Sequence, residues 1–156
     1  MKILSFGVPC YNSEEYMKKC IDSLLVGGED VEIIIVDDGS KDNTAAIADE
    51  YAAAYPDIIK VVHQENGGHG EAVNAGLRNA TGIYYKVVDS DDWLDEDGLH
   101  KVIEVLKSFV EDKKRVDLMI CNYVGSIIFF VGLPPRNVLI CYATLDRMEK
   151  QCCSFI

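Results

Sequence analysis

Three carboxylates stand within four residues of one another at Asp89, Asp91 and Asp92, directly after an apolar run that ends at Val88. Carboxylates packed this closely repel one another and persist near a core only where a cation or protons compensate them. Oxygen-only ligands favour Mg²⁺ or Mn²⁺. Because alternate residues of an extended backbone point the same way, Asp89 and Asp91 can share one face. The sequence therefore predicts a divalent metal site at Asp89 and Asp91 that also takes phosphate oxygens of a substrate.

An Asp-x-Asp on its own is most simply a turn or a helix cap, because aspartate caps helices readily. Here three further polar clusters also follow apolar runs of strand length, at 9–14, 37–40 and 64–70. Ligands of open parallel sheets bind beyond the carboxyl ends of the strands, so we expect all four clusters at one sheet edge. This shared position favours a ligand site over four unrelated turns.

The cluster at 37–40 offers groups that suit a nucleobase. Asp38 can accept an N–H from the base, and Gly39 lets the backbone approach closely. Tyr11, from the first cluster, can stack on the base. The alternative for this cluster is an Asp-Gly turn that leads into the cap of the next helix.

The glycine-rich stretch at 67–70 allows a phosphate or a sugar to approach, although such loops are common and the signal is weak by itself. His69 lies within this stretch and is the only histidine that we expect at the ligand edge. It is a candidate for sugar or phosphate contact, with a structural or solvent-facing role as the alternative.

The elements that must position these clusters alternate along the chain. Apolar runs of strand length recur at 3–8, 31–36, 58–63, 83–88 and 116–121. Helices are expected after a cap at Asn12 or Ser13, over 43–55, over 70–82 and from 95–97 onward. The runs are nearly continuous in Val, Ile and Tyr, as in parallel strands that helices cover on both faces. We therefore predict an α/β fold, a three-layer sandwich with a mostly parallel sheet.

Charge and composition exclude several classes of function. With 156 residues and 49% apolar composition, the chain is long enough for one buried core. The net charge of −11 argues against binding to nucleic acid or to an anionic membrane surface. All of this charge lies before residue 117, because residues 117–156 hold three basic and three acidic side chains.

The chain carries features of a cytoplasmic protein. Its first apolar run, at 3–8, is too short for the core of a signal peptide. Six cysteines show no CxxC pair and no metal spacing, which indicates reduced thiols. The uncharged stretch 118–135 is interrupted by polar residues and glycines, so we interpret it as buried strands and not as a membrane helix. We expect a cytoplasmic location, with the membrane periphery as a further option.

Four motifs in this order resemble those of family-two glycosyltransferases with the GT-A fold, over about residues 1–122. The matching segments are Pro9-x-Tyr11-Asn12-x-Glu14, Val36-Asp37-Asp38-Gly39-Ser40-x-Asp42-x-Thr44, Asn66-x-Gly through Asn74-x-Gly76-x-x-x-Ala80-x-Gly82, and Tyr85 through Trp93. The order and the separations make the resemblance specific, whereas any single motif would not.

The resemblance implies a metal-dependent transferase, and the roles of its residues are carried over one by one. Asp38 would bind the nucleobase, Asp89 would contact ribose or metal, and Asp91 would ligate Mg²⁺ or Mn²⁺. The implied donor is a UDP-sugar, from which inverting members transfer the sugar by in-line displacement while a carboxylate base deprotonates the acceptor hydroxyl. The remaining candidate nucleotide-sugar contacts are Pro9, Tyr11, Glu14, Asp37, Ser40 and Asn74.

One position departs from the family pattern inside the matching region. Many relatives carry an arginine before the asparagine of the central segment, and this chain has Val73 there. A donor-phosphate contact is then expected to be absent or to come from Lys86 or Arg78.

The carboxyl-terminal segment 123–156 is unassigned. Family members usually continue into an acceptor-binding half that supplies the base, and 124–156 shows no resemblance to one. The base is therefore not identified, since Asp117, Asp146 and Glu149 are most simply solvated surface charges. Because the resemblance ends where the charge pattern changes, we hypothesise a truncated or frame-shifted form of a longer transferase.

Two functions follow from this interpretation. The first is transfer of a sugar from a UDP-sugar to a glycan, lipid-linked or other hydroxyl acceptor. The second is a module that binds nucleotide-sugar and metal without transferring sugar. Exposed strands of an incomplete sheet also allow a homodimer.

Two other doubly wound folds are discounted. A phospho-acceptor receiver domain needs an acidic pair after the first strand and a lysine after the fifth, where this chain has Pro9-Cys10 and Asn122. A dinucleotide-binding Rossmann domain needs GxGxxG after the first strand, and none is present.

Overall fold

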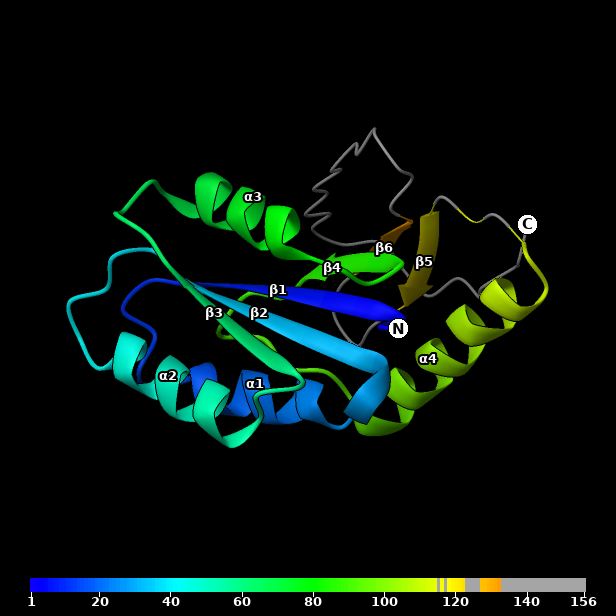
Figure 1. Ribbon diagram of the computed structural model, residues 1–156, viewed down its shortest axis with the longest axis horizontal. Coiled ribbons are helices and arrows are strands. Elements are labelled where there is room, and N and C mark those ends of the chain that lie inside the picture. The colour runs from blue at the N-terminus through cyan, green and yellow to red at the C-terminus, as the bar shows by residue number, and fades with distance from the viewer. Residues whose placement is uncertain (115, 117, 123–126, 133–156) are drawn as a thin grey trace.

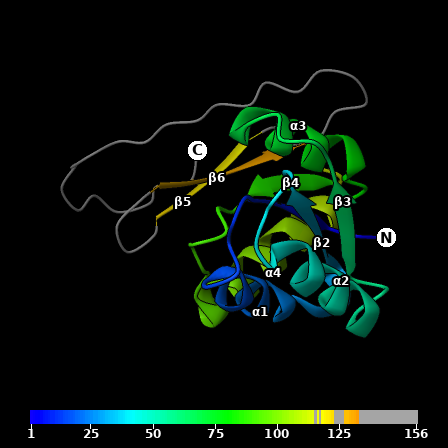
Figure 2. The same cartoon turned by 90° about the vertical axis from the view of Figure 1, so that its left-hand side faces the viewer.

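Six strands form one sheet, in the order β3-β2-β1-β4-β6-β5, in a computed structural model that describes residues 1–114, 116, 118–122 and 127–132. The first four strands in this order are mutually parallel. Figure 2 shows β3 and β5 at opposite ends of the sheet. The strands are β1 (Leu4–Cys10), β2 (Val31–Asp37), β3 (Ile59–His63), β4 (Tyr84–Val87), β5 (Leu118–Asn122) and β6 (Ile127–Gly132).

Helices cover both faces of this sheet. Helices α1, α2 and α4 lie on one face and α3 lies on the other (Figure 1). The predicted three-layer α/β sandwich is therefore confirmed. The helices are α1 (Met17–Leu25), α2 (Thr44–Ala54), α3 (His69–Asn79) and α4 (Glu96–Glu111), with a short 3₁₀ helix at Gly28–Asp30.

Strand β2 shows why the apolar runs are continuous. Ile33 and Ile35 belong to the larger core beneath α1, α2 and α4, whereas Ile34 and Val36 pack with Ala72 of α3 on the other face. All four β2 side chains are fully buried. Because successive side chains of a strand point to opposite faces, a strand between two helical layers needs apolar residues along its covered part, here Ile33 to Val36.

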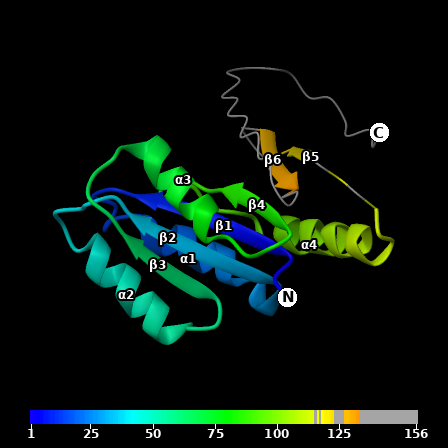
Figure 3. The same cartoon turned by 45° about the horizontal axis from the view of Figure 1, so that its top comes forward.

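The strand at the carboxyl end is predicted correctly in position but not in pairing. We expected the run at 116–121 to continue the parallel βαβ pattern, and instead β5 pairs antiparallel with β6, which itself pairs antiparallel with β4. Only residues 123–126 separate β5 from β6. A parallel connection needs a dozen or more residues, so the spacing in sequence dictates an antiparallel pair. Figure 3 shows β5 beside β6.

Our expectations for the rest of 123–156 concern residues outside those that the structure describes, because only 127–132 of that segment are placed. The same holds for Asp117, Asp146 and Glu149. Among the described helices, none has the length and apolarity needed to cross a membrane.

Tyr85 fills the space between β1 and α3, and glycines make room for it. A Cβ added at Gly7 would lie 1.9 Å from the Tyr85 hydroxyl oxygen, and one added at Gly76 would lie 2.6 Å from the same atom. Tyr85 is 3% exposed, and its hydroxyl donates to the backbone oxygen of Val73 at 3.3 Å. The tyrosine is therefore fixed by its hydrogen bond as well as by packing.

Gly7→Ala is expected to displace this tyrosine and to lower the free energy of unfolding by about 1–3 kcal/mol, the usual cost of overpacking a core. Urea denaturation measures the change. Gly70→Ala is the matched control, because a Cβ at Gly70 meets no atom within 4 Å. Equal stabilities of the two variants would contradict this account of the β1–α3 contact.

Candidate functional site

The four polar clusters lie beyond the carboxyl ends of β1, β2, β3 and β4. These strands are parallel, so their ends meet at one edge of the sheet, as the sequence predicts. Hydrogen bonds then connect the clusters to one another. The edge is therefore one continuous polar surface built from segments far apart in the sequence.

The loop that joins β3 to α3 holds the Asp38 carboxylate. Oδ1 of Asp38 accepts hydrogen bonds from the Gln64 side-chain amide at 2.7 Å and from the Gly67 backbone N–H at 2.8 Å. Oδ2 accepts one from the Gly68 backbone N–H at 2.9 Å. Asp38 is 3% exposed. Because a carboxylate offers about four lone-pair sites, one acceptor site remains, on Oδ2.

Gly39 brings the same loop against the turn after β2. Its φ is +71°, and an added Cβ would lie 2.8 Å from a backbone nitrogen of the facing loop. The sequence predicts that Gly39 permits a close backbone approach, and the structure shows that the approaching group is another segment of the protein.

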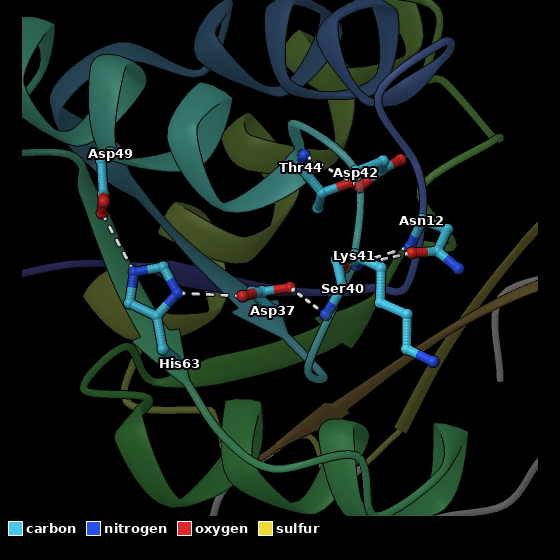
Figure 4. Close-up of polar contacts among 8 residues, drawn as sticks. All are labelled: Asn12, Asp37, Ser40, Lys41, Asp42, Thr44, Asp49 and His63. Carbon is cyan, nitrogen blue, oxygen red and sulfur yellow. Dashed lines mark hydrogen bonds and ion pairs between the residues drawn. The ribbon is translucent and has the colours of Figure 1, made fainter.

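The neighbouring carboxylate, Asp37, faces a different set of partners (Figure 4). Its Oδ1 accepts from the Ser40 backbone N–H at 3.1 Å, and its Oδ2 lies 3.0 Å from Nδ1 of His63. Nε2 of His63 lies 3.0 Å from Oδ1 of Asp49 in α2. Burial alone would raise the pKa of Asp37, but its hydrogen bonds to Ser40 and His63 lower the pKa below the ordinary value.

His63 is the last residue of β3, so it also lies at this edge, contrary to our expectation that His69 was the only histidine there. Its hydrogen bonds to Asp37 and then to Asp49 raise the pKa of His63 above its ordinary value. The imidazole thus bridges the last residue of β2 to helix α2. No histidine spacing in the sequence signals this bridge, because both partners come from other elements.

His63→Gln is expected to remove a pH-dependent part of the stability, by less than about 1 kcal/mol because the side chain is 45% exposed. A raised folded-state pKa means that the contribution is fully present below the ordinary pKa of 6.5 and is lost as pH rises through the folded-state value. The stability difference between wild type and His63→Gln should therefore shrink between pH 6 and pH 9.

Urea denaturation across this pH range provides the measurement. His100→Gln serves as the control, because His100 is exposed on α4. A difference that is constant with pH would show that the His63 charge contributes nothing.

The segment between β1 and α1 is tied to the residues before α2. Oε2 of Glu14 accepts from the backbone N–H of Asn43 at 2.9 Å and from its side-chain amide at 2.7 Å. The Asn12 backbone N–H donates to the Ser40 hydroxyl at 3.0 Å. Helix α1 begins only at Met17, later than the predicted cap at Asn12 or Ser13. These two residues hydrogen-bond Ser40 and Thr44 instead.

Pro9 and Tyr11 flank the end of β1. Pro9 is buried opposite Val36 of β2, whereas the Tyr11 side chain is 47% exposed. An exposed aromatic ring beside buried Asp38 suits stacking against a planar ligand. The two residues therefore differ in exposure, because only the Tyr11 side chain lies at the surface.

The segment after β4 places carboxylates outside and a hydroxyl inside. Asp89 and Asp91 are exposed, whereas Ser90 is 8% exposed. Burial, followed by the charges of Asp91 and Asp89, raises the pKa of Asp92 above its ordinary value. The segment thus carries an excess of negative charge that a cation would relieve.

The donor set at this segment fits Mg²⁺ or Mn²⁺, because both ions prefer oxygen ligands and accept one or two carboxylates together with substrate phosphates. Within the described ranges, no three His, Cys, Asp or Glu side chains are arranged to hold a metal. Asp89 and Asp91 would therefore supply part of the coordination, and a substrate would supply more.

The basic and amide side chains of α3 have different partners. His69, at its start, has Nε2 3.8 Å from Oδ1 of Asp89. Arg78, in the last turn, pairs with Glu71, and Asn74 also hydrogen-bonds Glu71. Val73 is 2% exposed and faces the sheet. Of the two residues named for a phosphate contact, Arg78 is thus engaged within α3.

Sequence reasoning missed four residues that connect the clusters: Ser13, Thr44, Gln64 and Ser90. Ser13 and Ser90 are buried and their hydroxyl oxygens lie 2.9 Å apart. The Ser13 backbone N–H donates to the Thr44 hydroxyl at 2.7 Å. Their position beside the acidic motifs was the available signal, but hydroxyls are common in turns and their pairing depends on the tertiary fold.

Comparisons with known proteins agree with this arrangement. The model of a family described as glycosyl transferase family 2 matches residues 5–113. Glycosyltransferase GlyG of Streptococcus pneumoniae serotype 4 (strain ATCC BAA-334 / TIGR4) is 37% identical over 138 residues, which cover 83% of this chain and 44% of GlyG.

Two solved structures share the fold. S. aureus TarS 1-349 in complex with UDP-GlcNAc has a TM-score of 0.59 and 32% identity, over 72% of this chain and 32% of that one. The mannosyltransferase PcManGT from Pyrobaculum calidifontis, in complex with GDP-Man and Mn²⁺, has a TM-score of 0.57 and 27% identity, over 64% of this chain and 31% of that one. The chain spans less than half the length of each of these relatives.

Proposed function

Because the chain belongs to glycosyl transferase family 2, we propose that it binds a UDP-sugar with a divalent metal for transfer of the sugar to a hydroxyl acceptor. The observation that carries this proposal is the Asp38 carboxylate, which is fixed by three hydrogen bonds and retains one acceptor site. It lies at the same sheet edge as Asp89 and Asp91. Residues 1–122 would form the donor-binding domain.

The remaining acceptor site on Asp38 favours a uracil base. Uracil presents a single ring N–H, and one lone-pair site on Oδ2 suffices for it. Guanine presents a ring N–H and an adjacent amino group, so it requires two acceptor sites on the same carboxylate. TarS is in complex with UDP-GlcNAc and PcManGT with GDP-Man, so relatives differ in their nucleotide. The Asp38 geometry supports the uridine nucleotide for this chain.

The other candidate residues have supporting roles in this proposal. Tyr11 would stack on the base, and Pro9 would shape the base site from the end of β1. Glu14, Asp37 and Ser40 would hold the surrounding turns through the hydrogen bonds described above. Asn74 is exposed on α3 beside Glu71, and it would exchange that partner for the sugar or the diphosphate.

Asp89 and Asp91 would hold Mg²⁺ or Mn²⁺, which neutralises the departing diphosphate when bound. In the inverting reaction that we propose, the acceptor oxygen forms a bond to the anomeric carbon as the bond to the diphosphate oxygen breaks. The acceptor proton goes to a carboxylate base. None of the described carboxylates is assigned as that base.

Isothermal calorimetry with UDP and Mn²⁺ tests the binding part of this proposal. We expect UDP to bind more tightly with Mn²⁺ than without it, and GDP to bind more weakly than UDP. Absence of UDP binding under both conditions would refute the proposal. A UDP-release assay with UDP-sugars and varied hydroxyl acceptors then tests transfer.

A second candidate function is nucleotide-sugar and metal binding without transfer. It is favoured because the groups described at the sheet edge are those proposed for the donor and the metal, and none of them is assigned as the catalytic base. Donor binding without UDP release, with every acceptor tried, would support this function over the first. A glycan or lipid-linked acceptor, a cytoplasmic location near the membrane and a homodimer through an edge strand stay predictions.

A further inference from the structure

A buried hydroxyl pair connects the two halves of the proposed donor site. The Ser13 and Ser90 hydroxyl oxygens lie 2.9 Å apart, although the residues are 77 positions apart in the sequence. Ser13 is 1% exposed and Ser90 is 8% exposed, so water does not compete strongly for this hydrogen bond. The pair joins the segment after β1 to the acidic segment after β4.

Ser13 also makes hydrogen bonds to two segments of the proposed nucleotide site. Its hydroxyl accepts the Tyr11 backbone N–H at 3.2 Å, and its own backbone N–H donates to the Thr44 hydroxyl at 2.7 Å. Ser13 thus fixes the backbone of Tyr11 and reaches the first residue of α2. Through these contacts, one buried residue touches the segments that follow β1 and β2.

Ser90 stands between the two exposed carboxylates of the metal segment. Its neighbours are also anchored from beneath, because the Cys20 thiol of α1 donates to the Asp89 backbone oxygen at 3.5 Å. The Asp92 backbone N–H closes the turn by donating to the same oxygen at 2.9 Å. Asp89 and Asp91 therefore project from a backbone whose position is set by buried contacts.

We propose that Ser13 and Ser90 are positioning residues that hold the metal-binding carboxylates in register with the nucleotide segment. This inference rests on the proposed function. The pair touches neither substrate nor metal, and it acts by fixing in advance the spacing that a metal-bound nucleotide requires. Without the pair, that spacing must be ordered when nucleotide and metal bind together, and the ordering opposes binding.

Removal of either hydroxyl is therefore expected to lower the cooperativity between UDP and Mn²⁺. UDP and Mn²⁺ should each raise the affinity for the other by the same factor, because coupling between two ligands is reciprocal. Ser13→Ala or Ser90→Ala is expected to lower this factor about fivefold, the net worth of roughly one buried hydrogen bond. For Ser90→Ala, UDP affinity without Mn²⁺ should change less than twofold, since that variant keeps the contacts of Ser13 with Tyr11 and Thr44.

The test measures UDP affinity by calorimetry with and without Mn²⁺ for the wild type, both single variants and the double variant. Because the two hydroxyls act as a unit, the double variant should lose no more coupling than either single variant. Ser5→Ala is the matched control. Ser5 is also fully buried, and its hydroxyl bonds Glu32 and Gly82 at the opposite end of β1.

Ser5→Ala should lower stability but leave the coupling factor unchanged. If Ser13→Ala and Ser90→Ala behave like Ser5→Ala, with lower stability and full coupling, the positioning role is wrong while the proposed function stands. If the wild-type chain binds no UDP, the proposed function fails and this inference fails with it.

Discussion

Replacing Asp38 with alanine is expected to weaken UDP binding about 100-fold and to lower the free energy of unfolding by about 2–4 kcal/mol, because three donors lose one charged acceptor. The backbone N–H groups of Gly67 and Gly68 and the amide of Gln64 all converge on this carboxylate. Without it, the loop before α3 loses the acceptor of its three hydrogen bonds. The nucleobase of the proposed UDP ligand also loses its acceptor. Both effects arise from one side chain.

Asp38→Asn separates the two contributions to some extent. Asparagine keeps one oxygen, which can accept from Gly67 and Gln64, but its NH₂ group then faces the Gly68 N–H. We expect an intermediate loss of stability and nearly the full loss of UDP affinity, since no acceptor is left for the base.

Calorimetry with UDP and urea denaturation provide the measurements for both Asp38 variants. Asp57→Ala is the control for charge, because Asp57 is exposed between α2 and β3. Gln64→Ala removes one donor only and should have a smaller effect on stability. If Asp38→Ala bound UDP with wild-type affinity, Asp38 would be ruled out as the contact to the nucleobase.

The fold was largely predictable because its layers impose their pattern on the strands. A strand such as β2, covered on both faces from Ile33 to Val36, needs consecutive apolar side chains there, and this pattern is visible without the structure. The pairing of the strands at the carboxyl end was harder to predict from the sequence. A run such as 118–122 has the same composition whether its neighbour is parallel or antiparallel, and the short connection to β6 decides between them.

Within the site, the sequence reveals charged groups more readily than the neutral groups that place them. Asp38, Asp89 and Asp91 stand out because adjacent carboxylates demand an explanation. Ser13 and Ser90 do not, because a serine in a turn is unremarkable until a residue 77 positions away is brought to 2.9 Å from it. Contacts of this kind depend on chain topology and leave no local pattern.

Asp91→Asn is expected to abolish the Mn²⁺ dependence of UDP binding, with a fall in UDP affinity of about 100-fold at saturating Mn²⁺ and little change in its absence. The amide has no charge to attract the ion, and without the ion nothing offsets the repulsion between the diphosphate and the remaining carboxylates of this segment. Asp91 is exposed, so its loss should leave stability nearly unchanged.

Calorimetry with two ligands distinguishes a metal ligand from a general electrostatic effect. UDP carries the phosphates that share the ion, whereas uridine does not, so Asp91→Asn should leave uridine affinity unaltered. Asp112→Asn, an exposed carboxylate at the end of α4, controls for net charge and should keep the full response to Mn²⁺. If Asp91→Asn kept the response of UDP affinity to Mn²⁺, the ion would bind elsewhere. If UDP and uridine lost the same affinity, Asp91 would act on the nucleobase site. Only a loss confined to UDP with Mn²⁺ fits an aspartate that shares a metal ion with the diphosphate.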